Sequence, residues 1–70
     1  MTKSLNLTIS EAFAIAMYYR SKVFKQPIPK HILDKAKSVT KNRNITEKEM
    51  EQIYSIFTQP YTDLRKYFKE

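Results

Sequence analysis

The chain has 70 residues, 41 % of them hydrophobic, and its thirteen basic and seven acidic side chains give a net charge of +6. This length allows a single domain, residues 1–70, and the composition is too apolar for a disordered chain. Because cysteine and glycine are both absent, the sequence excludes disulfides, thiolate metal sites and the glycine-rich loops that bind phosphates or dinucleotides.

The first predicted helix covers residues 9–25. Thr8 and Glu11 occupy the two positions of a capping box, which marks the start of a helix. Apolar residues then recur at helical spacing. We expect them to form the buried face, which comprises Ile9, Phe13, Ala16, Met17, Val23 and Phe24. Arg20 projects from within this face, so it either extends to solvent at the helix end or pairs with an acid of another helix.

Two prolines separate this helix from a second one, predicted over residues 29–41. Proline cannot continue a helix, so Pro27 ends the first, whereas Pro29 suits the first turn of the second. The predicted buried stripe of the second helix consists of Ile32, Ala36 and Val39. The polar residues 40–44 are expected to form a basic loop.

The third predicted helix begins at a second capping box, formed by Thr46 and Glu49. Its apolar positions recur with helical periodicity at Met50, Ile53, Tyr54 and Phe57. Pro60 interrupts it, and the spacing of Tyr61, Leu64, Tyr67 and Phe68 predicts a short helix after that. The expected fold is all-α: a compact three-helix domain, similar to a homeodomain or helix-turn-helix, with a short fourth C-terminal helix.

The N-terminal residues allow one alternative to this fold. Leu5, Leu7 and Ile9 alternate with polar residues, as in the strand of a ribbon-helix-helix protein. That fold has one strand and two helices, whereas this chain contains enough periodic sequence for three or four helices. We therefore favour the all-α fold.

No arrangement of residues suggests an enzyme. The one histidine, His31, is interpreted as an exposed residue without a ligand. Glu47, Glu49 and Glu51 form an acidic cluster, but their spacing divides them between two helix faces. Acids in a first helical turn complement the helix dipole, so we attribute them to capping and expect neither a metal nor a cofactor.

The basic side chains are the functional candidates. Eight of them lie between residues 20 and 43 with only one acid, Asp34, so this segment carries +7 and the rest of the chain −1. Such a concentration of positive charge attracts polyanions and releases the counterions of phosphates. Lys30, Lys37 and Lys41 would share one helix face over roughly 16 Å. The predicted nucleic-acid-binding residues are Lys22, Lys25, Lys30, Lys37, Lys41 and Arg43.

The expected function is nucleic-acid binding with low sequence specificity, to DNA rather than RNA. The acids of the third helix would be repelled by phosphates, so the second helix and its flanking loops should make the contacts. Lysine–phosphate contacts position a protein but read little sequence. Tyr18 either stacks on the bases of a single strand or occupies a surface or a dimer interface.

Two other functions remain as alternatives. The first alternative is a protein-interaction module or inhibitor, of the phage or plasmid type, whose basic face docks on an acidic protein. Exposed aromatic residues remote from the lysines would favour it. Less favoured is attachment of the amphipathic first helix to a membrane surface. We expect a homodimer, because small domains without disulfides or metals often gain stability by association. No segment is a signal peptide or membrane span, which predicts a cytoplasmic protein.

Several spacings resemble a known family. The pattern consists of Asn6-Leu7-Thr8-x-x-Glu11, Tyr18-x-x-Ser21, Ile28-Pro29-x-x-Ile32 and a capped third helix ending in aromatic residues. It resembles the C-terminal DNA-binding domain of the membrane-tethered protein that organises protein-primed phage genome replication. This resemblance implies a homodimeric, homeodomain-like fold that binds single- and double-stranded DNA, and a role in phage or plasmid replication or regulation. No contact residue is transferred, because none of the matched positions is basic.

Overall fold

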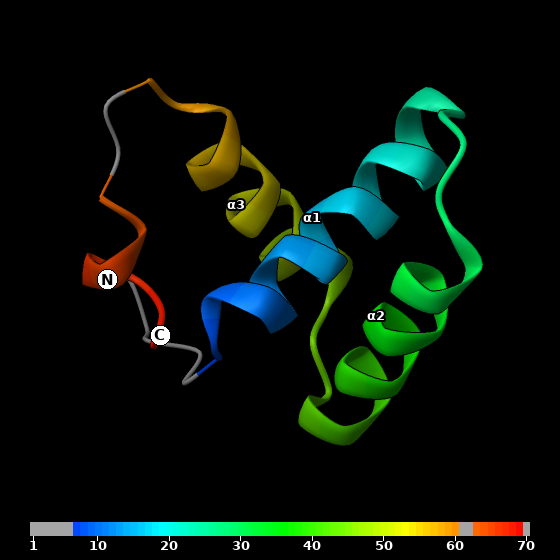
Figure 1. Ribbon diagram of the computed structural model, residues 1–70, viewed down its shortest axis with the longest axis horizontal. Coiled ribbons are helices and arrows are strands. Elements are labelled where there is room, and N and C mark those ends of the chain that lie inside the picture. Colours follow the sequence, from blue (N-terminus) through cyan, green and yellow to red (C-terminus); the bar gives the residue numbers. More distant parts are fainter. Residues whose placement is uncertain (1–6, 61–62, 70) are drawn as a thin grey trace.

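Helix α1 (Ile9–Phe24) lies between α2 (Lys30–Arg43) and α3 (Glu47–Thr58) and packs against both (Figure 1). The computed structural model describes residues 7–60 and 63–69. A 3-10 turn, η1 (Leu64–Lys66), follows α3 along the chain. The predicted all-α fold with three packed helices is therefore confirmed.

Both predicted capping boxes are present. The Thr8 hydroxyl accepts a hydrogen bond from the Glu11 amide at 3.1 Å, and the Glu11 carboxylate accepts one from the Thr8 amide at 3.0 Å. The same reciprocal pair joins Thr46 and Glu49, at 3.2 and 2.8 Å. Each pair satisfies two backbone amides that the first turn of a helix leaves unbonded, which fixes where α1 and α3 begin.

The ends of α1 and α2 are formed by residues in the left-handed conformation. Lys25 follows α1 with φ = 56°, and Asn44 follows α2 with φ = 52°. The predicted loop at residues 40–44 is wrong, because α2 continues to Arg43. The Thr40 hydroxyl donates to the Ala36 carbonyl within the helix, and the Asn44 amide donates back to the Thr40 carbonyl. A polar sequence does not end a helix when each group bonds within it.

The buried residues come from all three helices and from both flanking segments. The core cluster consists of Leu7, Ala12, Ile15, Ala16, Val39, Ile45, Met50, Ile53 and Phe68. The predicted buried face of α1 is partly wrong: Phe13, Val23 and Phe24 are 44 %, 48 % and 54 % exposed. Because α1 packs against a helix on each side, its small residues are buried instead, and Ala12, Ala14 and Ala16 allow close approach.

The C-terminal segment returns to the start of α1. The Lys69 amide donates a hydrogen bond to the Leu7 carbonyl, and the Lys69 carbonyl accepts one from the Ile9 amide, so the two segments form a bridge at Thr8. Phe68, the preceding residue, is buried. Ile9 belongs to α1, and the chain forms three packed helices where the ribbon-helix-helix fold has two, so that alternative is wrong. The predicted fourth helix is the shorter turn η1, while Leu5 and Tyr61 lie outside the described residues.

Candidate nucleic-acid interface

Three of the predicted contact residues line the solvent face of α2. Lys30, Lys37 and Lys41 are all exposed, and their spacing of seven and four residues places them on one side of the helix. The buried residues of α2, Ala36 and Val39, attach its other side to the core. Over the described part of the chain, none of these three lysines forms an ion pair or a side-chain hydrogen bond. Their charges are therefore available to an external anion.

Two further cations of α2, Arg43 and the unpredicted Lys35, interact with the first turn of α1. The Lys35 ammonium donates a hydrogen bond to the Ser10 hydroxyl and so joins α2 to the first turn of α1. The pKa of Glu11 is lowered, chiefly by its hydrogen bond from the Thr8 amide and further by the positive charges of Arg43 and Lys35. These two cations therefore favour the ionised form of Glu11 in the first turn of α1.

Lys22 differs from the other predicted contacts because it already has an anionic partner. Its ammonium lies 2.9 Å from a carboxylate oxygen of Glu47, the first residue of α3. This hydrogen bond and the negative charge of Glu47 raise the pKa of Lys22. The charge of Lys22 is thus directed towards α3, away from the α2 lysines. Lys25 is exposed at the C-terminal cap of α1, where the chain turns towards α2.

Two of the three acids of α3 have structural partners, whereas Glu51 lies beyond the first turn and takes no part in the capping box. Glu47 pairs with Lys22, and Glu49 completes the capping box of Thr46. Within residues 7–60 and 63–69, no three acidic or histidine side chains gather closely enough to hold a metal ion. His31 is an exposed residue in the first turn of α2.

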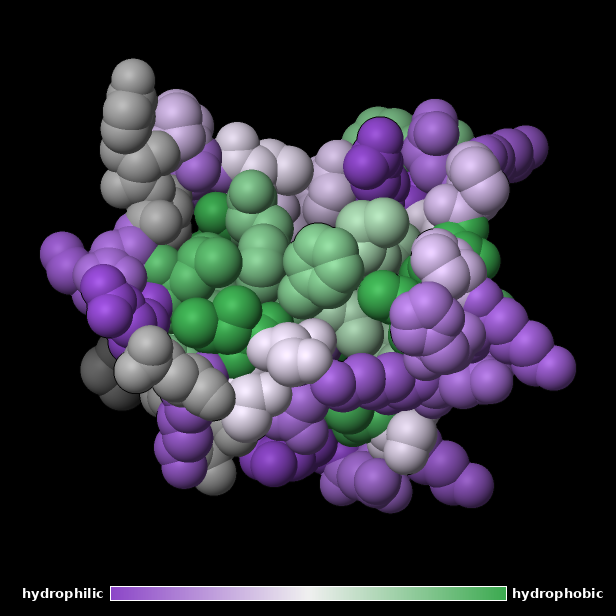
Figure 2. All heavy atoms as spheres, in the orientation of Figure 1, coloured by the Kyte–Doolittle hydropathy of each residue, from purple (hydrophilic) through white to green (hydrophobic). Residues whose placement is uncertain are grey.

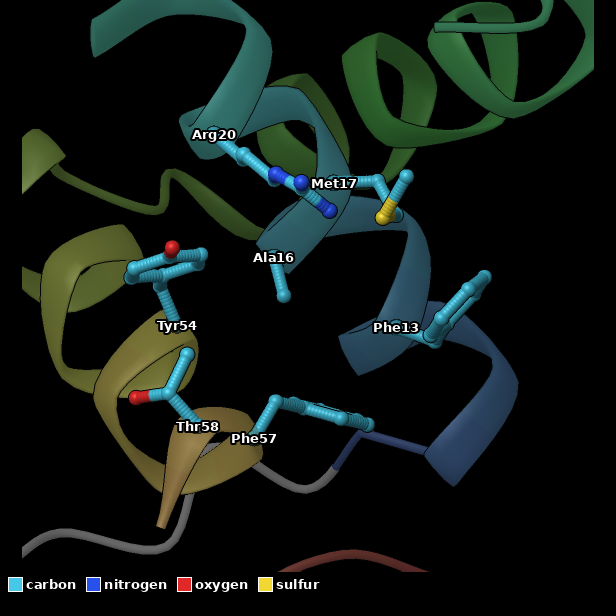
Figure 3. Close-up of a pocket in the computed structure, with 7 residues that line it drawn as sticks. All are labelled: Phe13, Ala16, Met17, Arg20, Tyr54, Phe57 and Thr58. Carbon is cyan, nitrogen blue, oxygen red and sulfur yellow. The ribbon is translucent and has the colours of Figure 1, made fainter. Parts of the chain in front are cut away.

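A groove between α1 and α3 was not predicted from the sequence. Its volume is about 180 Å³, and its lining comprises Phe13, Ala16, Met17, Arg20, Tyr54, Phe57 and Thr58 (Figure 3). Figure 2 shows the corresponding apolar area on the face formed by α1 and α3, bordered by hydrophilic side chains. The one available signal was Arg20, because a charged residue within an apolar helix face indicates that the face reaches solvent.

The exposed aromatic residues are separated in sequence from the α2 lysines. Among the described residues, the most exposed large apolar side chains are Phe13, Val23, Phe24 and Tyr67, and none belongs to α2. Tyr18, considered for base stacking, instead packs partly buried against the core cluster. The described residues of α2 therefore place no exposed large apolar side chain beside its lysines, whereas the exposed Phe24 directly precedes Lys25.

No known protein family, no curated protein and no solved structure matches this chain. The resemblance to the phage replication domain accordingly stays a prediction. In the described residues, none of the helices combines the length and the apolar character needed to span a bilayer.

Proposed function

We propose that the protein binds nucleic acid, DNA in preference to RNA, through phosphate contacts along α2. The observation that supports this most is the set of exposed, unpaired lysines on one face of that helix: Lys30, Lys37 and Lys41. Their ammonium groups neutralise successive phosphates, and the release of condensed cations supplies the favourable free energy.

The proposed contacts give little sequence specificity. Lysine binds phosphate as a point charge, and phosphates are identical at every base pair. Reading base edges would need amide or guanidinium groups in a groove, and the acidic start of α3 makes that helix unsuitable for entering one. Lys25 and Arg43, at the two ends of the α1–α2 pair, extend the basic surface, whereas Lys22 contributes less because Glu47 neutralises it.

A salt titration of DNA binding tests the proposal. Labelled duplex is titrated with protein at several salt concentrations, and fluorescence anisotropy gives the affinity. Replacing Lys37 and Lys41 with glutamine should flatten the slope of log K against log salt by about 1.8, since each lost duplex phosphate contact contributes about 0.9. A matched control replaces the exposed Lys48 and Lys66, which lie on α3 and η1, and removes the same charge.

The two variants distinguish DNA contacts at α2 from a general electrostatic attraction that depends only on the net charge of the protein. If α2 is the site, the control keeps the slope of the wild type within error and the α2 variant does not. Equal losses in both variants would show that only net charge matters, and absence of binding at low salt would refute nucleic-acid binding. Circular dichroism verifies that both variants stay folded.

The predicted homodimer belongs to this proposal. Two copies would present two α2 faces to one duplex and so increase the number of phosphates contacted. Sedimentation equilibrium of the free protein and of its DNA complex measures the stoichiometry directly.

A further inference from the structure

We propose that the groove between α1 and α3 binds an amphipathic helix of another protein, one that presents apolar side chains together with a single carboxylate. This surface is distinct from the α2 lysines and does not depend on the proposed DNA binding. Arg20 would bind the carboxylate, and the apolar lining would bind the rest.

The shape of the groove suits a helix. From α1 it is lined at four positions with helical spacing, Phe13, Ala16, Met17 and Arg20, and from α3 by Tyr54, Phe57 and Thr58. Two helices lined in this way form the kind of groove into which a third helix packs. The small side chain of Ala16 leaves room in the middle, and the positions from Phe13 to Arg20 rise by roughly 10 Å, about two turns of a partner helix.

Part of the lining is held in place by aromatic contacts. The rings of Phe13 and Phe57 meet edge to face across the groove, with centroids 6.0 Å apart. Phe57 in turn stacks on the buried Phe68 at 5.7 Å. Phe13 nevertheless stays 44 % exposed, so it retains apolar surface that a ligand would remove from water.

Arg20 provides the charge that the partner must complement. Its side chain lines the groove, and Figure 3 shows it on the opposite side of the open centre from Phe57. No described carboxylate lies within ion-pair distance of Arg20, and none lines the groove. A guanidinium beside an apolar surface, without an anion of its own, favours a ligand that brings one.

The same features argue against a second copy of this chain as the occupant. Two copies joined groove to groove would bring two Arg20 guanidinium groups together, because the groove contains no acid to separate them. Like charges at the centre of an interface oppose association.

A nucleic-acid strand fits the groove less well than an apolar helix does. Base edges carry several donors and acceptors, whereas most of the lining is apolar and the Thr58 hydroxyl already donates to the Ser55 carbonyl. A base buried there would lose hydrogen bonds to water without replacement. A strand also carries one negative charge per nucleotide, while the groove offers the single cation Arg20.

The test uses a synthetic, fluorescently labelled helical peptide with both ends blocked. Leucines at i, i+3 and i+4 face the groove, one glutamate at i+7 faces Arg20, and the remaining positions are alanine and glutamine. Control peptides carry lysine in place of the glutamate, or the same residues in scrambled order. Anisotropy measures affinity, and amide NMR shifts of the labelled protein locate the peptide.

Arg20→Gln should weaken binding of the glutamate peptide about tenfold, the loss expected for one charge-assisted hydrogen bond. Arg20→Glu should reverse the preference, so that the lysine peptide binds better than the glutamate peptide. Phe13→Ala should weaken both peptides. Val23→Ala is the matched control, because Val23 is similarly exposed on α1 but does not line the groove, and it should leave binding unchanged.

Three results would overturn the proposal. The first is no peptide binding at millimolar concentration by the folded wild type. The second is equal affinity of the wild type for the glutamate peptide and the scrambled peptide, or equal affinity of the glutamate peptide for the wild type and the Arg20→Glu variant. The third is occupation of the groove by another ligand: a dimer abolished by Phe13→Ala would assign it to a second copy, and groove shifts caused by single-stranded DNA would assign it to nucleic acid.

Discussion

Replacing Lys25 with glycine should stabilise the fold while weakening DNA binding. Lys25 caps α1 with φ = 56° and ψ = 39°, a left-handed conformation in which the Cβ of any residue but glycine crowds the backbone. The side chain is exposed and forms no ion pair or hydrogen bond with the described residues. Replacing Lys25 with glycine therefore removes a charge and a steric conflict but no ion pair or hydrogen bond within the described part of the protein.

The expected gain follows from two opposing contributions. The left-handed conformation costs a residue with a Cβ roughly 1–2 kcal/mol. Glycine regains this but loses about 0.4–1 kcal/mol through the greater freedom of the unfolded chain. The free energy of unfolding should thus rise by about 0.5–1 kcal/mol, which in a domain of this size raises Tm by roughly 3–6 °C.

The matched control is Lys25→Ala, which removes the same charge but keeps the Cβ. Urea unfolding followed by circular dichroism should show a higher midpoint for the glycine variant and no comparable rise for the alanine variant. In the DNA titration both variants should lose the same contact, with the salt slope flattened by about 0.9. Stability and binding are thereby separated at one position.

Equal unfolding midpoints for the glycine and alanine variants would refute this prediction, because the left-handed cap would then carry no steric cost. Asn44→Gly provides a second comparison at φ = 52°. Asparagine tolerates this conformation better than lysine does, so the gain at residue 44 should be the smaller one. A larger gain at residue 44 than at residue 25 would also contradict the argument.

Three further predictions concern other contacts. The pKa of Glu11 is lowered from 4.5 chiefly by the hydrogen bond from the Thr8 amide, so its stabilisation is complete above that pH and is lost as the pH falls; Glu11→Gln should flatten the fall of the urea midpoint below pH 4.5. Glu47→Gln leaves Lys22 without its carboxylate and should tighten duplex binding and steepen its salt slope by up to about 0.9, which anisotropy measures. Phe68→Ala should lower the free energy of unfolding by about 3–4 kcal/mol in urea unfolding, because this residue is 6 % exposed. Tyr67→Ala, at a residue 41 % exposed, should change it by less than about 1 kcal/mol.

The starts of the helices were predictable from the sequence because the groups that form them are close along the chain. Thr8 and Glu11 are three residues apart, as are Thr46 and Glu49, and each pair satisfies its own backbone amides. The ends were harder to place. Helices commonly end at a left-handed glycine, but in this chain Lys25 and Asn44 take that place, and lysine gives no signal of a helix end.

The buried face of α1 could not be chosen from periodicity alone. Large apolar residues and alanines occupy neighbouring sides of this helix, and the larger residues suggest the core. The structure buries Ala12, Ile15 and Ala16 because α1 has a helix on each side, which is a property of the whole fold. The groove was missed for the same reason: the sequence analysis placed Phe13 and Met17 in the buried face, whereas both line an open surface in the structure.

Among the predicted contact residues, positions on one helix could be predicted from the sequence, whereas contacts between helices could not. Lys30, Lys37 and Lys41 lie on one exposed face, as their spacing predicted, because the position of a residue on a helix depends only on the helix itself. The ion pair of Lys22 with Glu47 joins residues 25 positions apart and depends on how α3 crosses α1. No spacing rule within one helix reveals such a pair.

The central position of α1 explains why the molecule offers two chemically different surfaces. By burying its small residues against both neighbours, α1 leaves α2 free to expose lysines and leaves its own large apolar residues beside α3 (Figure 2). Uncompensated charge on one helix and a cation within an apolar groove on the others suit two different ligands. Because no α2 residue lines the groove, a helix bound there would leave the α2 lysines accessible, so the two proposed ligands can bind at the same time.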